Sequence, residues 1–528
     1  MPRKSPLEIP FPSPTVLCGL LWVAVVGLAF QFYGPAFQSG ANDALDYAAM
    51  GRNLARGEGF TTATLYPLQL SEGLGLRSRE DFDPRKVPNL HRPPLLPLIY
   101  SVAYRVFGES TLLFPSVSFL FYLILLSLVW YSSSPAPHLP GTESDLTRKV
   151  SFRATAVAVI ALFPPLVRQI PAGLAEIPAA VVCLAVTILL SSNRRNAGRV
   201  FAMGLLTGAG FLFKSYLLIL LLALAVFFWG EREKRGRWRN IALLSLGWLV
   251  ISGPWLFRNW IVAGNPFFTL QAYCEISKGI PGYEAFRAHR SLEPVSTWSF
   301  VRNHPGELWV KSISSLVVSA RSDVGANLAV LALGLIVWRQ SRKGELETRG
   351  PSRVLVLLLL VNVCIAILLA PINLEPRYLL PTLLPLLVLS LIGTAGRTKR
   401  GLHERYLVSL LVLFSVINLI GFSRAERTPD RREDGPFLSS RIPADGLVLT
   451  DADSFVAWFA DRPALWLPSD EEALERILES FPVLAVYLQG GLRSPYFAHY
   501  SSPEAALNRL RERFGSFEQT PSGAIFLH

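Results

Sequence analysis

The sequence predicts an α-helical polytopic membrane protein with about eleven transmembrane helices and a small α/β domain at its C-terminal end. Three observations support this fold class. Of the 528 residues, 51% are hydrophobic and only 17% are charged, a composition that is rare in soluble proteins. Apolar runs near the length that crosses a bilayer recur along the first 424 residues. The remaining residues are more polar and alternate short apolar runs with helical patterns, as α/β domains do.

The apolar runs approach the roughly 20 residues needed to cross about 30 Å of hydrocarbon. They lie at residues 15–35, 111–131, 154–170, 177–192, 200–229, 241–257, 324–338, 354–370, 379–394 and 406–422. The run at 200–229 is long enough for two short spans with Lys214 at the turn between them. The apolar segment at 93–107 reaches only about 22 Å as a helix, so we expect a juxtamembrane or re-entrant helix there.

Lysine and arginine gather in alternate loops, which predicts the orientation of the chain. The basic groups lie at residues 3–4, 148–153, 194–199, 232–239, 339–353 and 397–405. Because short cytoplasmic loops retain positive charge, we expect these loops and the N-terminus on the cytoplasmic side of the cell inner membrane. An odd number of crossings then places the C-terminal domain outside. The net charge of +12 reflects this topology and contact with anionic lipid head groups, and indicates no nucleic-acid partner.

The chain divides into a membrane body at residues 1–424, with external loops at 36–110 and 259–323, and an extracytoplasmic α/β domain at 425–528. This domain has no glycine-rich phosphate loop and no nucleophile elbow, so we expect a structural or acceptor-binding role for it. Three of the four cysteines fall in predicted spans and only Cys274 lies outside. Neither a disulfide framework nor a zinc motif follows from this pattern, and no metal or other cofactor is expected.

The first external loop begins with acidic residues at helical spacing. Asp43, Asp46 and Tyr47 are separated by three and four residues, so they share one face near a helix start. A carboxylate there can accept a proton, but an acid in a first turn also commonly complements the helix dipole. Several cations are predicted at the same external surface and favour a functional role: Arg92, Lys214, Arg258 and Arg377, the last followed by Tyr378.

These charged residues predict a site for a lipid phosphate. Charged groups at membrane depth cost roughly 2.5 to 3.5 kcal/mol each, so those that persist usually line a polar cavity or pair with a partner. Together the cations form a seat for a phosphate that faces a carboxylate base. Individually, Arg258 and Arg377 are also explained as residues that extend to the interface. Tyr378 either donates a hydrogen bond to the phosphate or belongs to the aromatic belt of the membrane.

Six segments carry a resemblance to a known family. In order they are NDALDYAAMGRNLARGEGF, HRPPLLPLIYSVAYRVFG, PAGLAEIPAA, GFLFKSY, GPWLFRNWIVAGNPF and EPRYLLPTLLPLL. Over most of the membrane body the chain resembles the GT-C superfamily of polyprenyl-phosphate-sugar-dependent glycosyltransferases, nearest to the protein O-mannosyltransferase and lipid A aminoarabinose transferase type. The resemblance implies a GT-C-like fold and transfer of a hexosyl or pentosyl group from a lipid-linked donor.

The resemblance also implies roles for individual residues. Asp43 matches the catalytic acid of the first loop, and Glu176 occupies the position of a second-loop acid, although Glu176 is equally explained as a helix-start acid. Arg92 is similar to a basic donor-phosphate ligand before Pro-Pro. Positions that approach the donor phosphate in relatives are matched by Tyr47 beside the first acid, and by Lys214, Arg258, Arg377 and Tyr378. Asp46 adds a second acid, so the base is either Asp43 or Asp46.

The chemistry of the family fits this set of residues. A sugar on a polyprenyl phosphate already carries a good leaving group, so the protein has to position the acceptor, take its proton and stabilise charge on the phosphate. Direct displacement with one carboxylate base inverts the anomeric carbon, whereas a retaining route needs a carboxylate nucleophile, which Asp46 leaves open. After the third predicted span there is no DxD motif, which disfavours the metal-dependent oligosaccharyltransferase branch.

The sequence does not identify the acceptor. A cell-envelope glycan, a lipid such as lipid A, or a protein hydroxyl group all remain candidates. Aromatic residues of the 259–323 loop either stack on sugars or anchor the loop at the membrane interface. The competing function is a transporter or flippase of lipid-linked sugars. Transporters place their key polar groups near the midplane in paired halves, whereas these charges cluster on one side and the two halves show no repeat. A purely structural envelope protein gives no reason for the aligned external charges.

Overall fold

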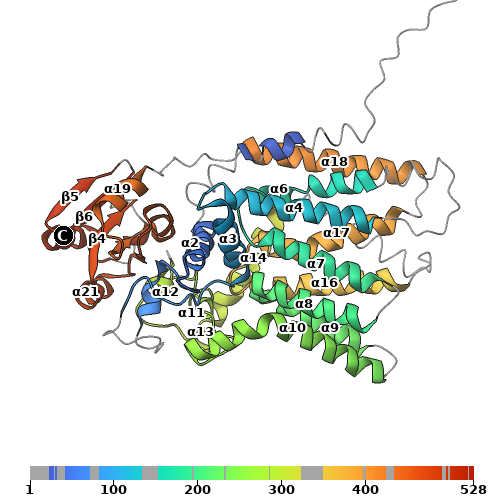
Figure 1. The fold of residues 1–528 in the computed structure, drawn as a ribbon, viewed down its shortest axis with the longest axis horizontal. Coiled ribbons are helices and arrows are strands. Elements are labelled where there is room, and N and C mark those ends of the chain that lie inside the picture. Colours follow the sequence, from blue (N-terminus) through green and yellow to red (C-terminus); the bar gives the residue numbers. More distant parts are fainter. Residues whose placement is uncertain are drawn as a thin grey trace, which may run out of the picture.

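The computed structural model describes residues 19, 23–28, 30–31, 42–71, 82–133, 153–192, 196–230, 234–284, 286–322, 349–395, 400–423, 433–489, 495–497, 500–520 and 522–528. A bundle of long helices forms one end of the molecule and a β-sheet with its own helices forms the other (Figure 1). Helices from the external loops lie between these two parts. The acidic motif of the first loop belongs to this middle layer.

The helical bundle follows the apolar runs of the sequence. Its main helices are α4 (Leu113–Ser132), α6 (Pro164–Gln169), α7 (Glu176–Ser191), α8 (Ala197–Phe213), α9 (Leu218–Trp229), α10 (Lys234–Ala263), α16 (Arg349–Leu369), α17 (Leu380–Ala395) and α18 (Arg400–Ser423). Residues 153–161 are helical too, as are the described residues within 15–35, and the run at 324–338 lies outside the described residues. Among the helices described, two are long and apolar enough to cross a membrane by themselves, Leu113–Ser132 and Gly236–Ala263. The count of eleven crossings stays a prediction.

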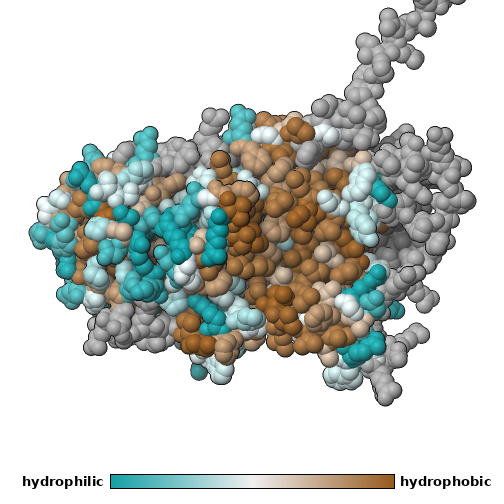
Figure 2. Space-filling view, in the orientation of Figure 1, coloured by the Kyte–Doolittle hydropathy of each residue, from teal (hydrophilic) through white to brown (hydrophobic). Residues whose placement is uncertain are grey.

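On the face shown in Figure 2, the helical bundle presents a wide apolar surface, while the sheet end is mostly hydrophilic. Large apolar side chains are exposed on several helices, including Leu120 on α4, Val226 on α9, Val250 on α10, Leu360 on α16 and Val412 on α18. Soluble monomers rarely expose apolar patches of this extent. The surface of the bundle is therefore suited to a lipid environment.

Close contact between α8 and α10 depends on two glycines. A Cβ atom at Gly204 would lie 2.3 Å from the carbonyl oxygen of Leu244, and one at Gly247 would lie 2.4 Å from that of Phe201. Small residues at a crossing let two helix backbones approach closely, which is how helices associate where the hydrophobic effect does not drive them together.

The middle layer contains α2 (Asn42–Arg56), α3 (Leu95–Phe107), η1 (Pro67–Leu70), α11 (Gln271–Cys274), α12 (Arg287–Arg290), α13 (Thr297–Asn303) and α14 (Pro305–Ser322). Helix α3 occupies the short apolar segment that was expected at 93–107. It lies directly on α2, since a Cβ atom at Gly51 of α2 would be 2.7 Å from Tyr100 Cβ and 3.0 Å from the carbonyl oxygen of Pro97. The acid-bearing helix is thereby fixed against its neighbour.

The sheet has six strands in the order β1-β3-β2-β4-β6-β5. Its C-terminal strands are β2 (Leu447–Thr450), β3 (Ala464–Trp466), β4 (Val483–Leu488), β5 (Ser516–Gln519) and β6 (Ala524–Leu527). Strands β1 to β4 are parallel to one another. Strand β6 is antiparallel to β4, and β5 is antiparallel to β6. The accompanying helices are α19 (Asp434–Arg441), α20 (Asp453–Phe455), η5 (Val456–Ala460), α21 (Glu471–Ser480), η7 (Pro495–Phe497) and α22 (Pro503–Phe514). We call the described residues of 433–528 the C-terminal unit.

Strand β1 (Thr64–Leu65) was not predicted from the sequence. It belongs to the first external loop. It pairs in parallel with β3, with Thr64 opposite Ala464 and Leu65 opposite Leu465. The strands β2, β3, β4 and β6 coincide with apolar runs of the C-terminal sequence, and α21 and α22 with its helical patterns. The expected boundary near residue 425 therefore divides the chain but does not divide the sheet.

Candidate functional site

The candidate site begins at the N-terminal end of α2. Asp43 lies in the first turn, and Asp46 and Tyr47 follow one turn later on the same face. The Asp43 side chain is 29% exposed, whereas that of Asp46 is 3% exposed. One carboxylate is therefore open to a ligand from outside, and the other is enclosed by protein.

Arg92 joins the two acids. Its Nη2 donates to Asp43 Oδ1 at 2.6 Å and its Nε donates to Asp46 Oδ2 at 2.7 Å. The guanidinium also lies over the ring of Tyr47, 5.4 Å from the centroid. A single planar cation thus fixes the relative orientation of all three residues, as the fork of guanidinium donors allows.

A tight turn before Arg92 presents this cation to the acids. Asn89 Oδ1 accepts from the backbone N–H groups of His91 and Arg92, and Asn89 Nδ2 donates to the carbonyl oxygen of Arg92 at 2.8 Å. Arg258 donates to the carbonyl oxygens of Asn89 at 2.7 Å and Phe60 at 3.2 Å. Arg258 therefore binds the backbone of the turn, and among the described residues it makes no ion pair with Asp43.

Arg377 approaches Asp43 from the opposite direction. It lies on η4 (Pro376–Leu379), and its Nη2 donates to Asp43 Oδ2 at 2.7 Å. Its Nε pairs with Glu375 at 2.6 Å and lies 3.6 Å from Glu176 Oε1. The two oxygens of Asp43 are thus each held by a different arginine.

Lys214 and Tyr378 complete the group beside Glu176. Lys214 lies between α8 and η3 (Ser215–Leu217), and its Nζ donates to Glu176 Oε1 at 2.9 Å. Both Lys214 and Arg377 lie over the ring of Tyr378, at 5.4 and 5.3 Å from its centroid. The hydroxyl of Tyr216 donates to the carbonyl oxygen of Tyr378 at 2.9 Å. Glu176 is fully buried, and its Oε2 has no hydrogen-bond partner among the described residues.

The surroundings give the two aspartates opposite pKa shifts. Burial by itself raises the pKa of Asp43, but the charges of Arg92, Arg377 and Lys214 outweigh it and bring that pKa well below its ordinary value. Burial also raises the pKa of Asp46, and Arg92 does not fully compensate, so the pKa of Asp46 stays above its ordinary value. Asp43 is therefore the more firmly ionised acid.

The structure brings eight of the nine predicted site residues together and leaves Arg258 behind the Arg92 turn. We use the name ion-pair group for the charged side chains at this place: Asp43, Asp46, Arg92, Glu176, Lys214, Glu375 and Arg377. Glu375, Asn89 and Tyr216 were not predicted from the sequence. Glu375 stands two residues before Arg377 in the EPRY segment, which is a usable signal for an ion pair. Hydrogen bonds to backbone oxygens, such as that of Tyr216, leave no comparable pattern.

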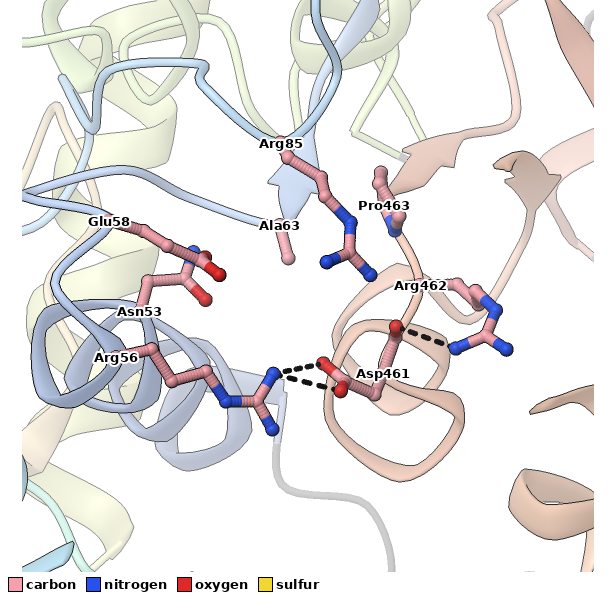
Figure 3. Close-up of a pocket in the computed structure, with 8 residues that line it drawn as sticks. All are labelled: Asn53, Arg56, Glu58, Ala63, Arg85, Asp461, Arg462 and Pro463. Atoms are coloured by element: carbon pink, nitrogen blue, oxygen red, sulfur yellow. Dashed lines mark hydrogen bonds and ion pairs between the residues drawn. The ribbon is translucent and has the colours of Figure 1, made fainter. Parts of the chain in front are cut away.

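A small pocket opens elsewhere, at the C-terminal end of α2 (Figure 3). It is lined by Asn53, Arg56, Glu58, Ala63, Arg85, Asp461, Arg462 and Pro463. In Figure 3, Arg56 points toward both carboxylate oxygens of Asp461, and these contacts measure 3.0 and 2.8 Å. The pocket marks the junction of the first loop with the C-terminal unit, and it contains no residue of the ion-pair group.

The whole-chain arrangement matches solved structures of two membrane transferases. ArnT from Cupriavidus metallidurans bound to undecaprenyl phosphate superposes with a TM-score of 0.57 at 14% identity, covering 97% of this chain and 98% of that one. The apo form of the same protein gives a TM-score of 0.56 at 14% identity, covering 98% of both chains. The chain has a GT-C fold.

A second neighbour shares the GT-C fold. The oligosaccharyltransferase of Archaeoglobus fulgidus, tethered to an acceptor peptide, superposes with a TM-score of 0.51 at 13% identity, covering 98% of this chain and 74% of that one. No protein-family model matches the sequence, and no curated protein matches it either. At these identities the likeness shows the fold, and the function has to be argued from the site.

Proposed function

We propose that this protein is an integral membrane glycosyltransferase that moves a sugar from a polyprenyl-phosphate donor to an acceptor in the cell envelope. The observation that carries the proposal is the Asp43 carboxylate, partly exposed and held at 2.6 Å by Arg92 and at 2.7 Å by Arg377. A carboxylate between two arginines combines a base with the cations that a phosphate leaving group requires.

The cations of the ion-pair group are suited to a lipid phosphate. Arg92 and Arg377 present guanidinium groups, which bind phosphate oxygens through paired hydrogen bonds, and Lys214 adds a point charge. Tyr378 lies against both Arg377 and Lys214. The similar fold of an ArnT that binds undecaprenyl phosphate supports a polyprenyl phosphate as the carrier.

Donor binding activates Asp43 in this proposal. Both arginines are occupied by Asp43 in the structure, and these contacts keep the pKa of Asp43 low, which makes it a weak base. A donor phosphate that takes over the arginines removes this stabilisation of the carboxylate. The pKa of Asp43 then rises and its oxygens become free to accept a proton, so the acceptor is activated only when the donor is in place.

The transfer step follows from these positions. Asp43 accepts the proton of an acceptor hydroxyl or amine as the acceptor atom forms its bond to the anomeric carbon. The bond from that carbon to the phosphate oxygen breaks, and the polyprenyl phosphate leaves with its added negative charge against Arg92 and Arg377. A single displacement inverts the anomeric carbon. Asp46 is nearly inaccessible and is bound to Arg92, so we assign it to orienting Arg92.

We further propose that the reaction takes place on the extracytoplasmic side of the cell inner membrane, with the N-terminus cytoplasmic and the C-terminal unit outside. The acceptor is a hydroxyl or amine of an envelope glycan, lipid or protein. Arg258 holds the backbone of the Arg92 turn, and we assign it to positioning Arg92 in place of direct phosphate binding.

The test measures transfer of radiolabelled sugar from polyprenyl-phosphate donors to envelope material, using membranes that contain wild type, Asp43→Asn or Asp46→Asn at matched protein levels. Loss of the base lowers the rate by about 10²- to 10⁴-fold, so we expect that loss for Asp43→Asn and a smaller one for Asp46→Asn. Asp83→Asn, an exposed acid of the same loop, is the matched control and keeps wild-type activity.

Full activity of Asp43→Asn contradicts a base role for Asp43, and a large loss with Asp46→Asn alone moves that role to Asp46. Absence of transfer by wild type with every donor contradicts the transferase itself. In that case, movement of a labelled lipid-linked sugar across the bilayer identifies the flippase.

A further inference from the structure

The side of α2 opposite Asp43 carries a buried arginine that the proposed mechanism does not use. Arg52 follows Asp43 by nine residues, which places it about 180° around the helix. Its side chain is 4% exposed. A guanidinium enclosed in this way needs hydrogen-bond acceptors for its donors. Among the described residues, its hydrogen-bond and ion-pair partners all belong to the C-terminal unit.

Three groups of the C-terminal unit bind Arg52. The carbonyl oxygens of Trp458, at 2.9 Å, and of Ala457 accept its Nη1 and Nη2 hydrogens. Asp461 pairs with Nη2 at 2.9 Å. The guanidinium also stacks over the ring of Trp458 at 4.8 Å from the centroid. The planar guanidinium makes the two hydrogen bonds, the ion pair and the ring contact at the same time. A lysine ammonium does not reproduce this geometry.

The backbone at η5 is shaped to present these acceptors. Residues Val456–Ala460 form a π-helical turn, and Asp461 after it adopts a left-handed conformation with φ of 53°. Single π-helical turns are rare and occur often at functional sites. Trp458 is fixed in turn by Phe114 and Tyr104, at ring-centroid distances of 5.2 and 5.7 Å. The turn is therefore tied to α3 and α4 as well as to α2.

The chain between α2 and the Arg92 turn is held by the same unit. Strand β1 pairs with β3, and the backbone N–H of Ala464 donates to the carbonyl oxygen of Ala63 at 2.8 Å. The segment that supplies both Asp43 and Arg92 is thus attached to the C-terminal unit, and Arg52 and β1 are buried parts of this attachment.

We propose that Arg52 is a positioning residue through which the C-terminal unit sets the placement of Asp43 against Arg92 and Arg377. The C-terminal unit then contributes to the geometry of the transfer site, in addition to any role in binding the acceptor. The inference rests on the proposed transferase function, but the placement of α2 can be measured without it.

The experiment compares wild type, Arg52→Gln and Arg52→Lys by steady-state transfer and by hydrogen exchange of the α2 backbone amides. A misplacement of about 1 Å costs on the order of 10²-fold in rate. We therefore expect kcat of Arg52→Gln to fall by about 10- to 100-fold while the KM for donor changes little. Arg52→Lys recovers part of kcat, and the α2 amides exchange faster in both variants.

The matched control is Arg85→Gln. Arg85 is half-buried and donates from the same loop to the carbonyl oxygen of Ala444 in the same unit at 2.9 Å, and among the described residues its side chain makes no hydrogen bond to α2. We expect the kcat of Arg85→Gln and the hydrogen exchange of its α2 amides to stay at wild-type levels. If Arg52→Gln does not fold, Arg52→Lys carries the test, since it keeps the charge.

Wild-type kcat and wild-type α2 exchange in the Arg52 variants overturn the proposal, and so does an equal effect of Arg85→Gln. If wild type transfers no sugar, the transferase function fails separately, and the exchange of the α2 amides still tests whether Arg52 holds the helix.

Discussion

The two ends of α2 use charge in different ways. At the N-terminal end, Asp43 is partly exposed and its partners are side chains from distant elements, Arg92 and Arg377. At the C-terminal end, Arg52 is buried and most of its partners are backbone carbonyls of η5. Side-chain ion pairs that are partly exposed can be exchanged for a ligand, whereas Arg52 is enclosed together with the backbone oxygens that bind it. The N-terminal end of α2 is therefore suited to ligand exchange, and the C-terminal end is suited to fixing the helix.

Sequence neighbours in the same helix thus belong to different parts of the mechanism. In the proposed mechanism, a donor phosphate enters this end by replacing Asp43 as the partner of Arg92 and Arg377. The proposed role of the other end, through Arg52, is to keep Asp43 in place once those pairs are broken.

The largest effect is expected at the exchangeable end. Arg377→Gln removes one phosphate ligand and one partner of Asp43, so kcat/KM for the donor falls by about 10²- to 10³-fold, as for the loss of other charge-stabilising donors. Steady-state transfer at several donor concentrations measures it. Arg105→Gln, an exposed arginine that donates to the last carbonyls of α2 at 3.0 and 3.2 Å, is the control. A change under threefold in Arg377→Gln speaks against a phosphate role.

The next effect is a pH dependence of stability that comes from Asp453. This residue lies on α20 of the C-terminal unit, and α20 packs against α2. Burial raises the pKa of Asp453 to about 7 from its ordinary 3.8. The folded state then binds the extra proton between these two pH values, so the free energy of unfolding falls by about 1.4 kcal/mol for each pH unit of increase. Asp453→Asn removes this slope. Unfolding of both proteins as a function of pH tests it, and parallel curves contradict it.

The third prediction concerns Gly51, where the middle of α2 packs closely against α3. Gly51→Ala places a Cβ atom 2.7 Å from Tyr100 Cβ, and such overpacking costs about 1 to 3 kcal/mol. Gly253→Ala, with no atom within 4 Å of its Cβ, is the control and leaves stability unchanged or raises it. Thermal unfolding of the purified proteins compares the two. An equal midpoint for both variants would show that α2 tolerates displacement.

The smallest effect is expected for Arg56 at the last turn of α2. Its partners Glu109 and Asp461 are exposed by 36% and 40%, and Arg56 itself by 34%. Ion pairs of this kind contribute roughly 0 to 1 kcal/mol, so Arg56→Gln changes the unfolding midpoint and the transfer rate only slightly. A loss as large as that of Arg52→Gln would mean that the surface pair, and not the buried one, holds the helix.

The sequence predicted most of the ion-pair group, because most of its members stand in a recognisable sequence context. Asp43 and Asp46 follow a helical period, Arg92 precedes two prolines, and Arg377 lies at the external end of a predicted span. The fold class was also accessible, since composition and apolar runs indicate a helical membrane protein.

The remaining features depend on contacts that sequence patterns do not encode. Arg258 and Arg52 bind backbone carbonyls, and an arginine that binds a carbonyl is indistinguishable in sequence from one that binds a phosphate. Strand β1 has only two residues, too few for a visible alternation. Its pairing with β3 joins positions 400 residues apart, which no local pattern reveals.

The central claim is that a donor phosphate displaces Asp43 from Arg92 and Arg377, and a structure with bound polyprenyl phosphate tests it most directly. The account predicts that both guanidinium groups contact phosphate oxygens and that the Asp43 oxygens lie free of them, while Arg52 keeps its contacts with η5. A bound phosphate with both Asp43 ion pairs intact, at the 2.6 and 2.7 Å found here, would contradict it.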